Sequence, residues 1–507
     1  MNIAFRTDAS SQIGTGHFMR CLTLAVGLKQ HGIQIRFVSR NLPDHLHNML
    51  ATKGMELVLL KNNANDSQID NLAHSAWLGI SQAQDAQDTI QALSGQSWDW
   101  LIVDHYALDT RWETAMRETA KQIMVIDDIA DRQHECDVLL DQNFYSDMQT
   151  CYSGKVPAHC QLLLGPRYAL LREEFRTLRE QIKPHTGEVK RLLVFFGGVD
   201  ADNYTGLAIK ALADIASKEM HIDVVIGVQH PCRAEIELQC ATQEFVCHVQ
   251  TDKMAELMAA ADLAIGAGGS STWERCCLGL PTLALSIAEN QRKVIIAAAE
   301  AGLLYAPSGD AYILELISRH VLALLENPIL LKLMSTAAMN AVDGKGLMRV
   351  IDILAINQIT IRQATELDVQ PLFEWRNHST IRAVSHHKSP ISWHEHLTWL
   401  HDVLNDQHRE LLIGECGTQP VGVVRFDLEG AVAEVSIYLV PNAGFKGQGR
   451  HLLLMAEQWL IENHPDINCV RACVLSKNKA SERLFMASYY QQQNIFYQKE
   501  LIKVNPR

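Results

Sequence analysis

The chain has 507 residues, of which 47% are hydrophobic and 20% charged, an ordinary globular composition with room for roughly three domains. Its formal net charge of -13 argues against nucleic acid or an anionic membrane as a partner, since both bind basic surfaces. No apolar stretch approaches the roughly 20 residues of a membrane span, and the first residues lack the pattern of a signal peptide. The 12 cysteines include no CxxC pair and are typical of reduced thiols. We therefore expect a cytoplasmic protein.

The first two thirds of the chain follow an α/β rhythm. Residues 1–340 alternate short apolar runs with amphipathic stretches, which predicts βα units around parallel sheets. The polar segment 181–190 separates two such series, and helical patterns close the second one. Two consecutive doubly wound domains, expected over 1–183 and 184–356, would place a ligand cleft at the carboxyl ends of their strands.

A different rhythm begins near residue 359. A strand and two helices are followed by three strands, a glycine-rich turn, and then alternating helices and strands. This order predicts an α+β domain around a largely antiparallel sheet, over 357–507. The predicted fold class is α/β, with two doubly wound Rossmann-type domains followed by an α+β domain.

A loop that ends in a histidine follows the first predicted strand and opens a helix. Gly14 and Gly16 permit a tight turn and close approach of a ligand, while a helix start offers free N–H groups to negative charge. A plain βα turn fits these glycines as well. His17 adds a titratable base at the lip of the cleft, where a core histidine is not expected. Three aspartates could orient His17 or water, bind sugar hydroxyls or cap strands: Asp8, Asp104 and Asp127.

A second glycine-rich loop, at 266–274, again lies between a predicted strand and a helix. The amide of Gly269 and the hydroxyls of Ser270 and Ser271 can hold phosphate oxygens. Glu274, one turn into the helix, can accept hydrogen bonds from a ribose diol. A further loop brings three polar residues to the same cleft: Glu289, Asn290 and Gln291. Two facing loops indicate a nucleotide ligand more specifically than either loop alone.

These loops belong to a longer series of motifs: FRTDASSQIGTGHFMR, VDHY, IDD, LLGPRYALLREEF, FFGGVD, GAGGSSTWE and AENQ. In this order, over about residues 1–350, they resemble the UDP-sugar hydrolases of pseudaminic acid biosynthesis, which are similar in fold to GT-B glycosyltransferases. The resemblance implies hydrolysis of UDP-2,4-diacetamido-2,4,6-trideoxy-β-L-altropyranose to UDP and the free sugar. It implies that His17 is the catalytic base and that Asn290 binds substrate. The other expected substrate-binding residues are Arg6, Asp8, Gly14, Gly16, Asp104, Tyr106, Gly269, Ser270, Ser271, Glu274, Glu289 and Gln291.

The chemistry of such a cleavage fits these residue types. It needs an activated water and stabilisation of the departing UDP. Since UDP is a good leaving group, the paired carboxylates of glycosidases are not required. Two alternatives remain open: an inverting glycosyltransferase, in which a sugar acceptor replaces water, and a non-catalytic sugar-nucleotide sensor.

The last domain carries a third glycine-rich loop, at 444–450. Its successive N–H groups can bind a pyrophosphate, and the antiparallel context argues against a dinucleotide-binding Rossmann loop. With the motifs EWRNH, IYLVP and NKASERLF, the layout resembles the GNAT acetyltransferases, and most closely an amino-sugar N-acetyltransferase of the same pathway. The resemblance implies acetyl-CoA as cosubstrate and the 4-amino group of a UDP-amino sugar as acceptor; protein N-terminal acetylation is the alternative. The expected coenzyme-binding residues are Lys446, Gly447, Gly449, Arg450 and Asn478.

Two positions depart from the GNAT pattern. Gly444 stands where many relatives have Gln or Arg, and Phe485 stands where many have the tyrosine proposed to protonate the departing thiolate. Tyr489, Tyr490 or water could take over that role. Glu434 is a candidate base for the substrate ammonium or an ordinary strand residue. The histidines at four nearby positions lack a third ligand at suitable spacing, so no metal is expected: His386, His387, His394 and His396.

Overall fold

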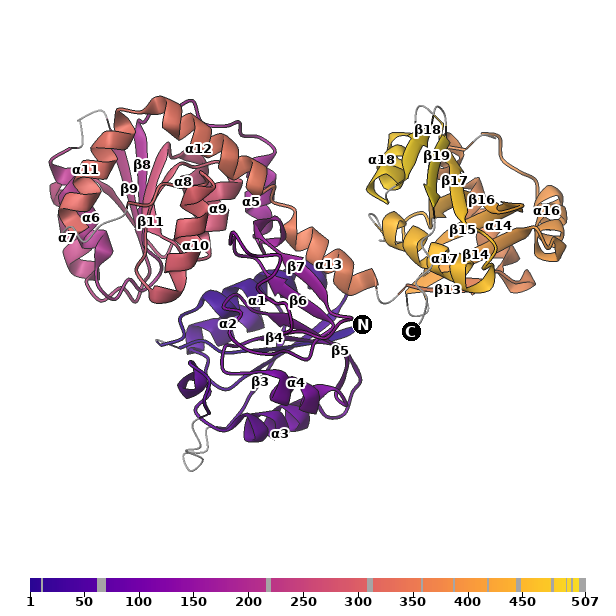
Figure 1. Cartoon of the computed structure of the whole chain (residues 1–507), viewed down its shortest axis with the longest axis horizontal. Coiled ribbons are helices and arrows are strands. Elements are labelled where there is room, and N and C mark those ends of the chain that lie inside the picture. Colours follow the sequence, from indigo (N-terminus) through magenta and orange to yellow (C-terminus); the bar gives the residue numbers. More distant parts are fainter. Residues whose placement is uncertain are drawn as a thin grey trace. The chain divides into compact units, whose positions relative to one another are not determined.

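The computed structural model comprises two compact units, Met1–Ile351 and Asp352–Arg507 (Figure 1). It describes the chain except for residues 11, 62–69, 216–219, 308–312, 357–358, 386–387, 417–418, 444–447, 476–477, 489, 494–495 and 501–507, and except for the side chains of 289–290, 355–356, 487, 492–493 and 496–500.

The first unit begins with a seven-stranded sheet in the order β3-β2-β1-β4-β5-β6-β7, and every pair of neighbours is parallel. The strands are β1 (Asn2–Thr7), β2 (Gln34–Ser39), β3 (Glu56–Leu59), β4 (Trp98–Asp104), β5 (Ala120–Ile126), β6 (Val138–Asp141) and β7 (Gln161–Leu164). The intervening helices are α1 (Gly16–Gln30), α2 (Asp44–Thr52), η1 (Ser75–Trp77), α3 (Gln82–Leu93), α4 (Thr110–Met116) and η2 (Pro166–Tyr168). Because β1 lies between β2 and β4, its apolar residues are fully buried, as in the centre of a doubly wound sheet.

A second parallel sheet, in the order β10-β9-β8-β11-β12, completes the unit. Its strands are β8 (Arg191–Phe195), β9 (His221–Ile226), β10 (Val246–Val249), β11 (Leu263–Ala267) and β12 (Thr282–Leu285). Its helices are α6 (Tyr204–Ala213), α7 (Arg233–Thr242), α8 (Met254–Ala260), α9 (Ser271–Cys277), α10 (Glu289–Glu300), α11 (Ile313–Leu325) and α12 (Pro328–Ala341). The predicted pair of parallel α/β domains is confirmed.

Two helices cross between these domains. Helix α5 (Glu173–Arg179) precedes the second sheet, yet its fully buried Phe175 packs in the second domain's core with Trp273. Helix α13 (Gly346–Ile356) follows the second sheet and packs on α1 of the first domain. A Cβ on Gly27 would lie only 2.6 Å from Cδ1 of Ile351, so the glycine lets the two helices approach closely. The domain boundaries expected from sequence, after residues 183 and 356, therefore each come after a crossing helix. That these boundaries separate functional domains stays a prediction.

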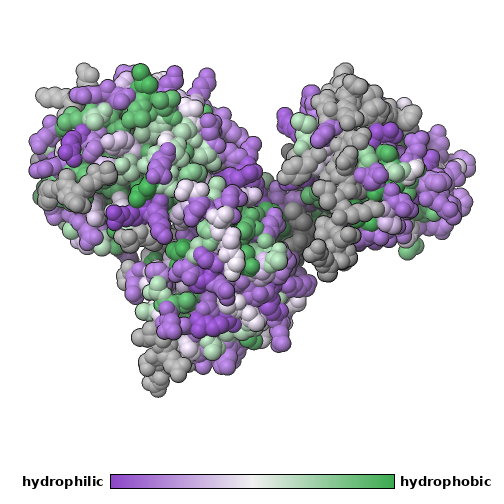
Figure 2. All heavy atoms as spheres, in the orientation of Figure 1, coloured by the Kyte–Doolittle hydropathy of each residue, from purple (hydrophilic) through white to green (hydrophobic). Residues whose placement is uncertain are grey.

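Within the described residues no single helix is long and apolar enough to cross a membrane; one pair, Ile313–Leu325 with Pro328–Leu354, meets the length and composition only when counted across its 94° bend. On the face drawn in Figure 2, hydrophobic residues form separate patches among hydrophilic ones.

The second unit is built on a mixed sheet in the order β13-β14-β15-β16-β17-β19-β18. The strands are β13 (Ile359–Gln363), β14 (Arg409–Cys416), β15 (Gln419–Glu429), β16 (Val432–Leu439), β17 (Cys469–Cys473), β18 (Gln491–Gln493) and β19 (Phe496–Glu500). The helices are η3 (Glu366–Asp368), α14 (Val369–Asn377), α15 (Ser379–Ala383), α16 (Trp393–Asn405), α17 (Gly449–Asn463) and α18 (Lys479–Ala487). All neighbouring pairs are antiparallel except β16 with β17, so the predicted α+β domain is confirmed.

The parallel pair β16 and β17 separates along its length. Val432–Glu434 pairs with Cys469–Arg471, whereas the rest of β16 pairs only with β15 among the described residues. Helices α17 and α18 both begin beyond the carboxyl ends of these two strands. The glycine-rich loop that precedes α17 therefore lies at the open end of the strand pair.

Candidate active sites

His17 lies against a buried carboxylate. Strands β1 and β4 are parallel neighbours with Thr7 opposite Asp104, so the loop after β1 returns over the end of β4. His17, the second residue of α1, binds Oδ1 of Asp104 through Nδ1 at 2.6 Å. The histidine is 9% exposed and Asp104 is fully buried, so the predicted lip residue is in fact largely enclosed. Since Nδ1 is occupied, Nε2 is the ring nitrogen that can act on a ligand.

Arg20 completes this arrangement from the next turn of α1. Its Nε and Nη2 donate to the two oxygens of Asp104 at 2.6 and 2.7 Å. Burial by itself would raise the pKa of Asp104, but the charges of Arg20 and His17 hold that pKa well below its usual range. Asp104 is therefore a carboxylate that can orient the imidazole and stabilise its protonated form. The sequence did not single out Arg20, although its spacing of three residues from His17 puts both on one helix face.

The second aspartate of the IDD motif extends the cluster. Asp128 accepts hydrogen bonds from Nη1 of Arg20, at 2.8 Å, and from the hydroxyl of Tyr106. The Tyr106 ring contacts that of His17 edge-on, with 4.5 Å between the ring centroids. Asp127 points elsewhere: it accepts the backbone N–H of Ala130 at 2.9 Å and is fully buried. Orientation of His17 thus falls to Asp104, and Asp127 holds the turn after β5.

Arg6 and Asp8 need correction as substrate-binding residues. Both are fully buried, and Nη1 of Arg6 lies 2.7 Å from Oδ1 of Asp8. Arg6 also pairs with Asp85 at 2.8 Å, and Asp8 accepts the backbone N–H of Arg40 at 2.7 Å. Neither side chain leaves a surface for a ligand, so the pair supports the His17 loop from beneath.

Two further aromatic residues stand beside His17. Trp77, in η1, stacks on Tyr106 at 5.5 Å and lies 6.1 Å from His17, while His74 lies 4.4 Å from Trp77. We call His74, Trp77 and Tyr106 the aromatic wall. His74 and Trp77 are half-buried, whereas Tyr106 is buried. No sequence motif marks His74 or Trp77, because they belong to an irregular segment between β3 and α3.

The second-domain loop is partly accessible. Ser270 is exposed, and Gly269, Ser271 and Glu274 are half-buried around the start of the seven-residue helix α9. Burial raises the pKa of Glu274, partly offset by Arg172, whose Nη2 lies 3.5 Å away. A Cβ on Gly269 would lie 3.9 Å from Nε2 of Gln291, which brings that residue beside the loop. The side chains of the other two predicted residues lie outside the described part of the chain: Glu289 and Asn290.

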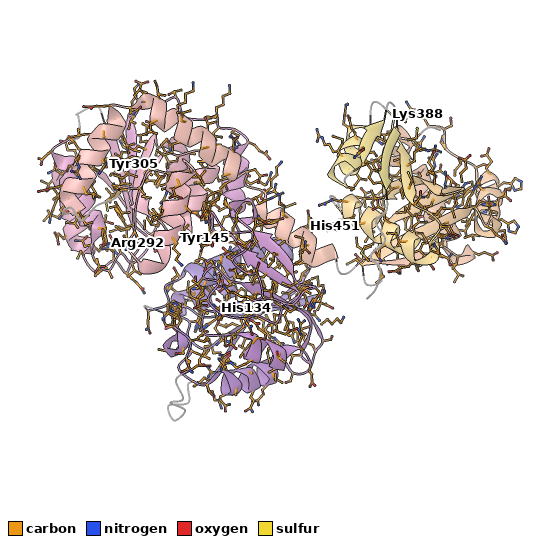
Figure 3. All side chains as sticks on the ribbon, viewed as in Figure 1. His134, Tyr145, Arg292, Tyr305, Lys388 and His451 are labelled. Atoms are coloured by element: carbon orange, nitrogen blue, oxygen red, sulfur yellow. The ribbon has the colours of Figure 1, made fainter. Side chains whose placement is uncertain are left out.

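Hydrogen bonds connect this loop to the His17 cluster. Nε1 of Trp273, in α9, donates to Oδ1 of Asn143 at 3.0 Å. Nδ2 of Asn143 donates to Asp128 at 3.2 Å, and the hydroxyl of Tyr145, labelled in Figure 3, donates to the carbonyl of Asp128 at 2.5 Å. The two predicted loops are thus linked through Asn143, which the sequence did not indicate.

A separate buried ion cluster surrounds His134, also labelled in Figure 3. Its Nδ1 lies 2.8 Å from Glu113, and both side chains are fully buried. Burial would lower the pKa of His134, but Glu113 and Asp127 raise it to about 9. The imidazole is therefore charged at neutral pH and holds the loop before β6 in place.

The coenzyme loop of the second unit is described only in part. Lys446, Gly447 and Gly444 lie outside the described residues. Gly449 and Arg450 form the first turn of α17, and Oδ1 of Asn478 accepts the N–H of Ser481 at 3.1 Å as the cap of α18. Between them, these helices put their free N-terminal amides at the open end of β16 and β17. Among all the described residues, no three His, Cys, Asp or Glu side chains form a metal site.

Phe485 and Tyr490 are core residues of this unit. Both are 3% exposed, with ring centroids 4.9 Å apart. The Tyr490 hydroxyl donates to Glu457 at 2.7 Å, and burial, together with Glu457, raises its pKa far above the usual range. Tyr490 is thus a poor candidate for protonating a thiolate; Tyr489 lies outside the described residues.

Glu434 lines an open groove of about 620 Å³ on the sheet. Its side chain is 41% exposed and pairs with Arg471 at 3.2 Å. Glu434 is also the last residue of β16 that pairs with β17, so it stands where the two strands separate. The groove is bordered further by Trp399, Arg409, Arg425 and Asp427. This position keeps Glu434 a candidate base.

Known proteins resemble both units. Residues 358–488 match the family described as "Acetyltransferase (GNAT) domain". The chain is 24% identical to an uncharacterized protein of Methanocaldococcus jannaschii, covering 96% of each, and 29% identical over 204 residues to the UDP-2,4-diacetamido-2,4,6-trideoxy-beta-L-altropyranose hydrolase of Campylobacter jejuni, covering 40% of this chain and 62% of that one. It is 24% identical to the spore coat polysaccharide biosynthesis protein SpsG of Bacillus subtilis, covering 70% of this chain and 98% of that one. Residues 358–488 therefore form a GNAT acetyltransferase domain, and the N-terminal unit is a pair of parallel α/β domains with sequence similarity to a sugar-nucleotide hydrolase.

Proposed function

We propose that the chain is a bifunctional sugar-nucleotide enzyme of pseudaminic acid biosynthesis. Its first unit hydrolyses UDP-2,4-diacetamido-2,4,6-trideoxy-β-L-altropyranose, and its second unit acetylates the 4-amino group of the precursor UDP-amino sugar with acetyl-CoA. The observation that carries the first activity is the contact of His17 with a buried, ionised Asp104 at the end of β4. The similarity to the Campylobacter jejuni hydrolase supports the substrate class.

This geometry supports a hydrolytic step with His17 as the base. Nε2 of His17 takes a proton from water while the water oxygen attacks C1 of the sugar. The C1–O bond to the diphosphate breaks, and UDP leaves with the bonding electrons. Asp104 stabilises the imidazolium that forms, and Arg20 keeps Asp104 ionised. Loop hydroxyls of Ser270 and Ser271 are proposed to bind the departing diphosphate.

The acetyl transfer belongs to the open end of β16 and β17. The amide groups at the starts of α17 and α18 are proposed to hold the coenzyme A diphosphate, with acetyl-CoA as cosubstrate. Glu434 is proposed to accept the proton of the sugar ammonium, after which the amine attacks the thioester and coenzyme A leaves as thiolate. Since both cosubstrates are small cytoplasmic metabolites, a cytoplasmic location is part of the proposal.

Replacement of His17 tests the first activity. General-base catalysis is worth about 10²–10⁴-fold, so His17→Ala should lower UDP release by that order. Acetyl transfer, measured as coenzyme A release from the same preparation, should stay unchanged. His31→Ala removes an exposed histidine just beyond the other end of α1 and serves as the matched control.

Each alternative has its own outcome in this assay. A glycosyltransferase would release little UDP until a sugar acceptor is added, and a sensor would bind the sugar nucleotide without turnover. Near-normal UDP release by His17→Ala would contradict the assignment of the base. For the second unit, acetylation of a protein N-terminus in preference to the UDP-amino sugar would replace the proposed acceptor.

A further inference from the structure

The aromatic wall lies next to His17, and the proposed reaction assigns it no role. Trp77 stacks on Tyr106 with an interplanar angle of 26°, and His74 lies 5.3 Å from Tyr106, so the three rings form one surface. Trp77 and His74 are half-buried, so part of each residue is accessible. We propose that Trp77 and His74 bind the sugar ring of the UDP-sugar and select sugars that carry apolar groups, a role that rests on the proposed hydrolysis.

The position of the wall relative to His17 points to the sugar as its ligand. In the proposed step His17 acts on a water that attacks C1, so the sugar ring lies within contact distance of the imidazole. The Tyr106 and Trp77 centroids are 4.5 and 6.1 Å from that of His17, which is the separation of rings in contact. The uracil is separated from C1 by a diphosphate and a ribose, so it cannot occupy the same place.

The chemistry of the wall favours an apolar sugar face. Aromatic faces pack on C–H groups, and the hydrogen-bonding groups of Trp77 and His74, an indole N–H and two imidazole nitrogens, lie at the ring edges. A sugar with a C6 methyl and acetamido methyls presents such groups, whereas a C6 hydroxyl against the wall would lose its hydrogen bonds with water. Burial is the main cause that lowers the pKa of His74, so this ring is uncharged at physiological pH and can pack its face on the sugar without the cost of burying a charge.

The kinetic test compares Trp77→Ala with Trp77→Phe. Loss of an aromatic contact of this size lowers the affinity for the ligand about tenfold. Trp77→Ala should therefore raise the KM for the diacetamido-trideoxy UDP-sugar about tenfold and keep kcat within about threefold of the parent value. Trp77→Phe should keep most of the affinity, and inhibition by UDP should be unchanged in both. Trp393→Ala, which removes a 40% exposed tryptophan from the acetyltransferase unit, is the matched control and should leave hydrolysis unchanged.

Selectivity gives a second readout. UDP-N-acetylglucosamine carries a C6 hydroxyl, and Trp77→Ala should narrow the preference for the trideoxy sugar over it by about tenfold in binding. His74→Ala should act in the same direction with a smaller effect. Melting temperature and unchanged binding of UDP distinguish a folded variant from one that has merely lost its fold.

Binding without turnover separates this proposal from the proposed hydrolysis. Calorimetric titration with the intact UDP-sugar and with UDP compares His17→Ala with His17→Ala/Trp77→Ala. The double variant should bind the UDP-sugar more weakly than His17→Ala does and should bind UDP equally well. If the parent enzyme hydrolyses no UDP-sugar, the hydrolysis proposal fails, while the titration still tests the wall. Equal affinities of the two variants for the UDP-sugar, or an equal loss for UDP, would overturn the role of Trp77.

Discussion

Asp104→Asn changes one charge at the centre of the hydrolytic site and almost nothing of its shape. The carboxylate is fully buried and receives His17 and two donors of Arg20 within 2.7 Å. Whichever oxygen becomes an NH2 group, that group faces a donor of Arg20. The amide therefore fits the cluster poorly, and the imidazolium formed during water attack loses its counter-charge.

The size of the effect follows from the distances. Two unit charges about 4 Å apart interact by about 4 kcal/mol at an effective dielectric constant of about 20. At about 1.4 kcal/mol for each factor of ten, this sets an upper limit of roughly three orders of magnitude in rate. We expect kcat for UDP release to fall about 10²–10³-fold, with a small change in KM, because the fully buried Asp104 acts through its contact with His17.

The assay follows UDP release at saturating and limiting UDP-sugar. Asp99→Asn, at the other end of β4, removes a carboxylate that pairs with Lys121 at 2.7 Å and is the control. Breaking a buried ion pair also costs stability, so the melting temperature and coenzyme A release are measured on the same preparation. A folded Asp104→Asn protein with kcat within threefold of the parent would refute the dyad.

Three further predictions address stability and the second unit. The pKa of His134 is about 9 when folded and about 6.5 in an unfolded chain, so its contribution, about 3 kcal/mol, is complete below pH 6.5 and lost as the pH rises through 9. The free energy of unfolding, measured in urea from pH 6 to 10, should show this loss in the parent and should depend less on pH in His134→Gln. An equal pH dependence in the two proteins would contradict the prediction. Phe485→Tyr places a hydroxyl in the core and should lower the melting temperature without faster acetyl transfer, since an unpaired buried hydroxyl costs about 1–3 kcal/mol; a faster rate would contradict the core position. Fragments 1–356 and 357–507 should each fold and keep one activity, because the boundary between the two compact units along the chain follows Ile351. Two fragments that are active only when covalently joined would refute this.

The fold was predictable because its strands carry a strong local signal. The central strands are buried on both faces, so they read as continuous apolar runs between helical patterns. The final domain was recognisable from its change to antiparallel order and from motifs near its loops. The crossing of α5 and α13 between the two domains was not predictable. Nothing in the local sequence distinguishes a helix that packs on the sheet of its own domain from one that packs on the other domain.

The site was predictable only in part, from residues near the carboxyl ends of the strands. His17 is the second residue of α1 and Asp104 is the last residue of β4, and their contact depends on β1 and β4 being neighbours. Arg6 and Asp8 lie in the same region of the sequence but are buried. The sequence could not show this, because the Arg6 partner Asp85 is 79 residues away along the chain. Trp77 carried no signal at all, since its role comes from the rings around it.

The crossing helices make the two parallel domains inseparable by a single cut. Removal of everything after α5 would leave Phe175 without the core that buries it, and would also strip α13 from Gly27 and its neighbours on α1. The first domain therefore finishes folding only after the second has been made, since α13 is the last element of the unit to leave the ribosome. A stalled or truncated chain that ends before residue 346 would expose the apolar side of α1, which makes such intermediates natural targets for chaperones and proteases.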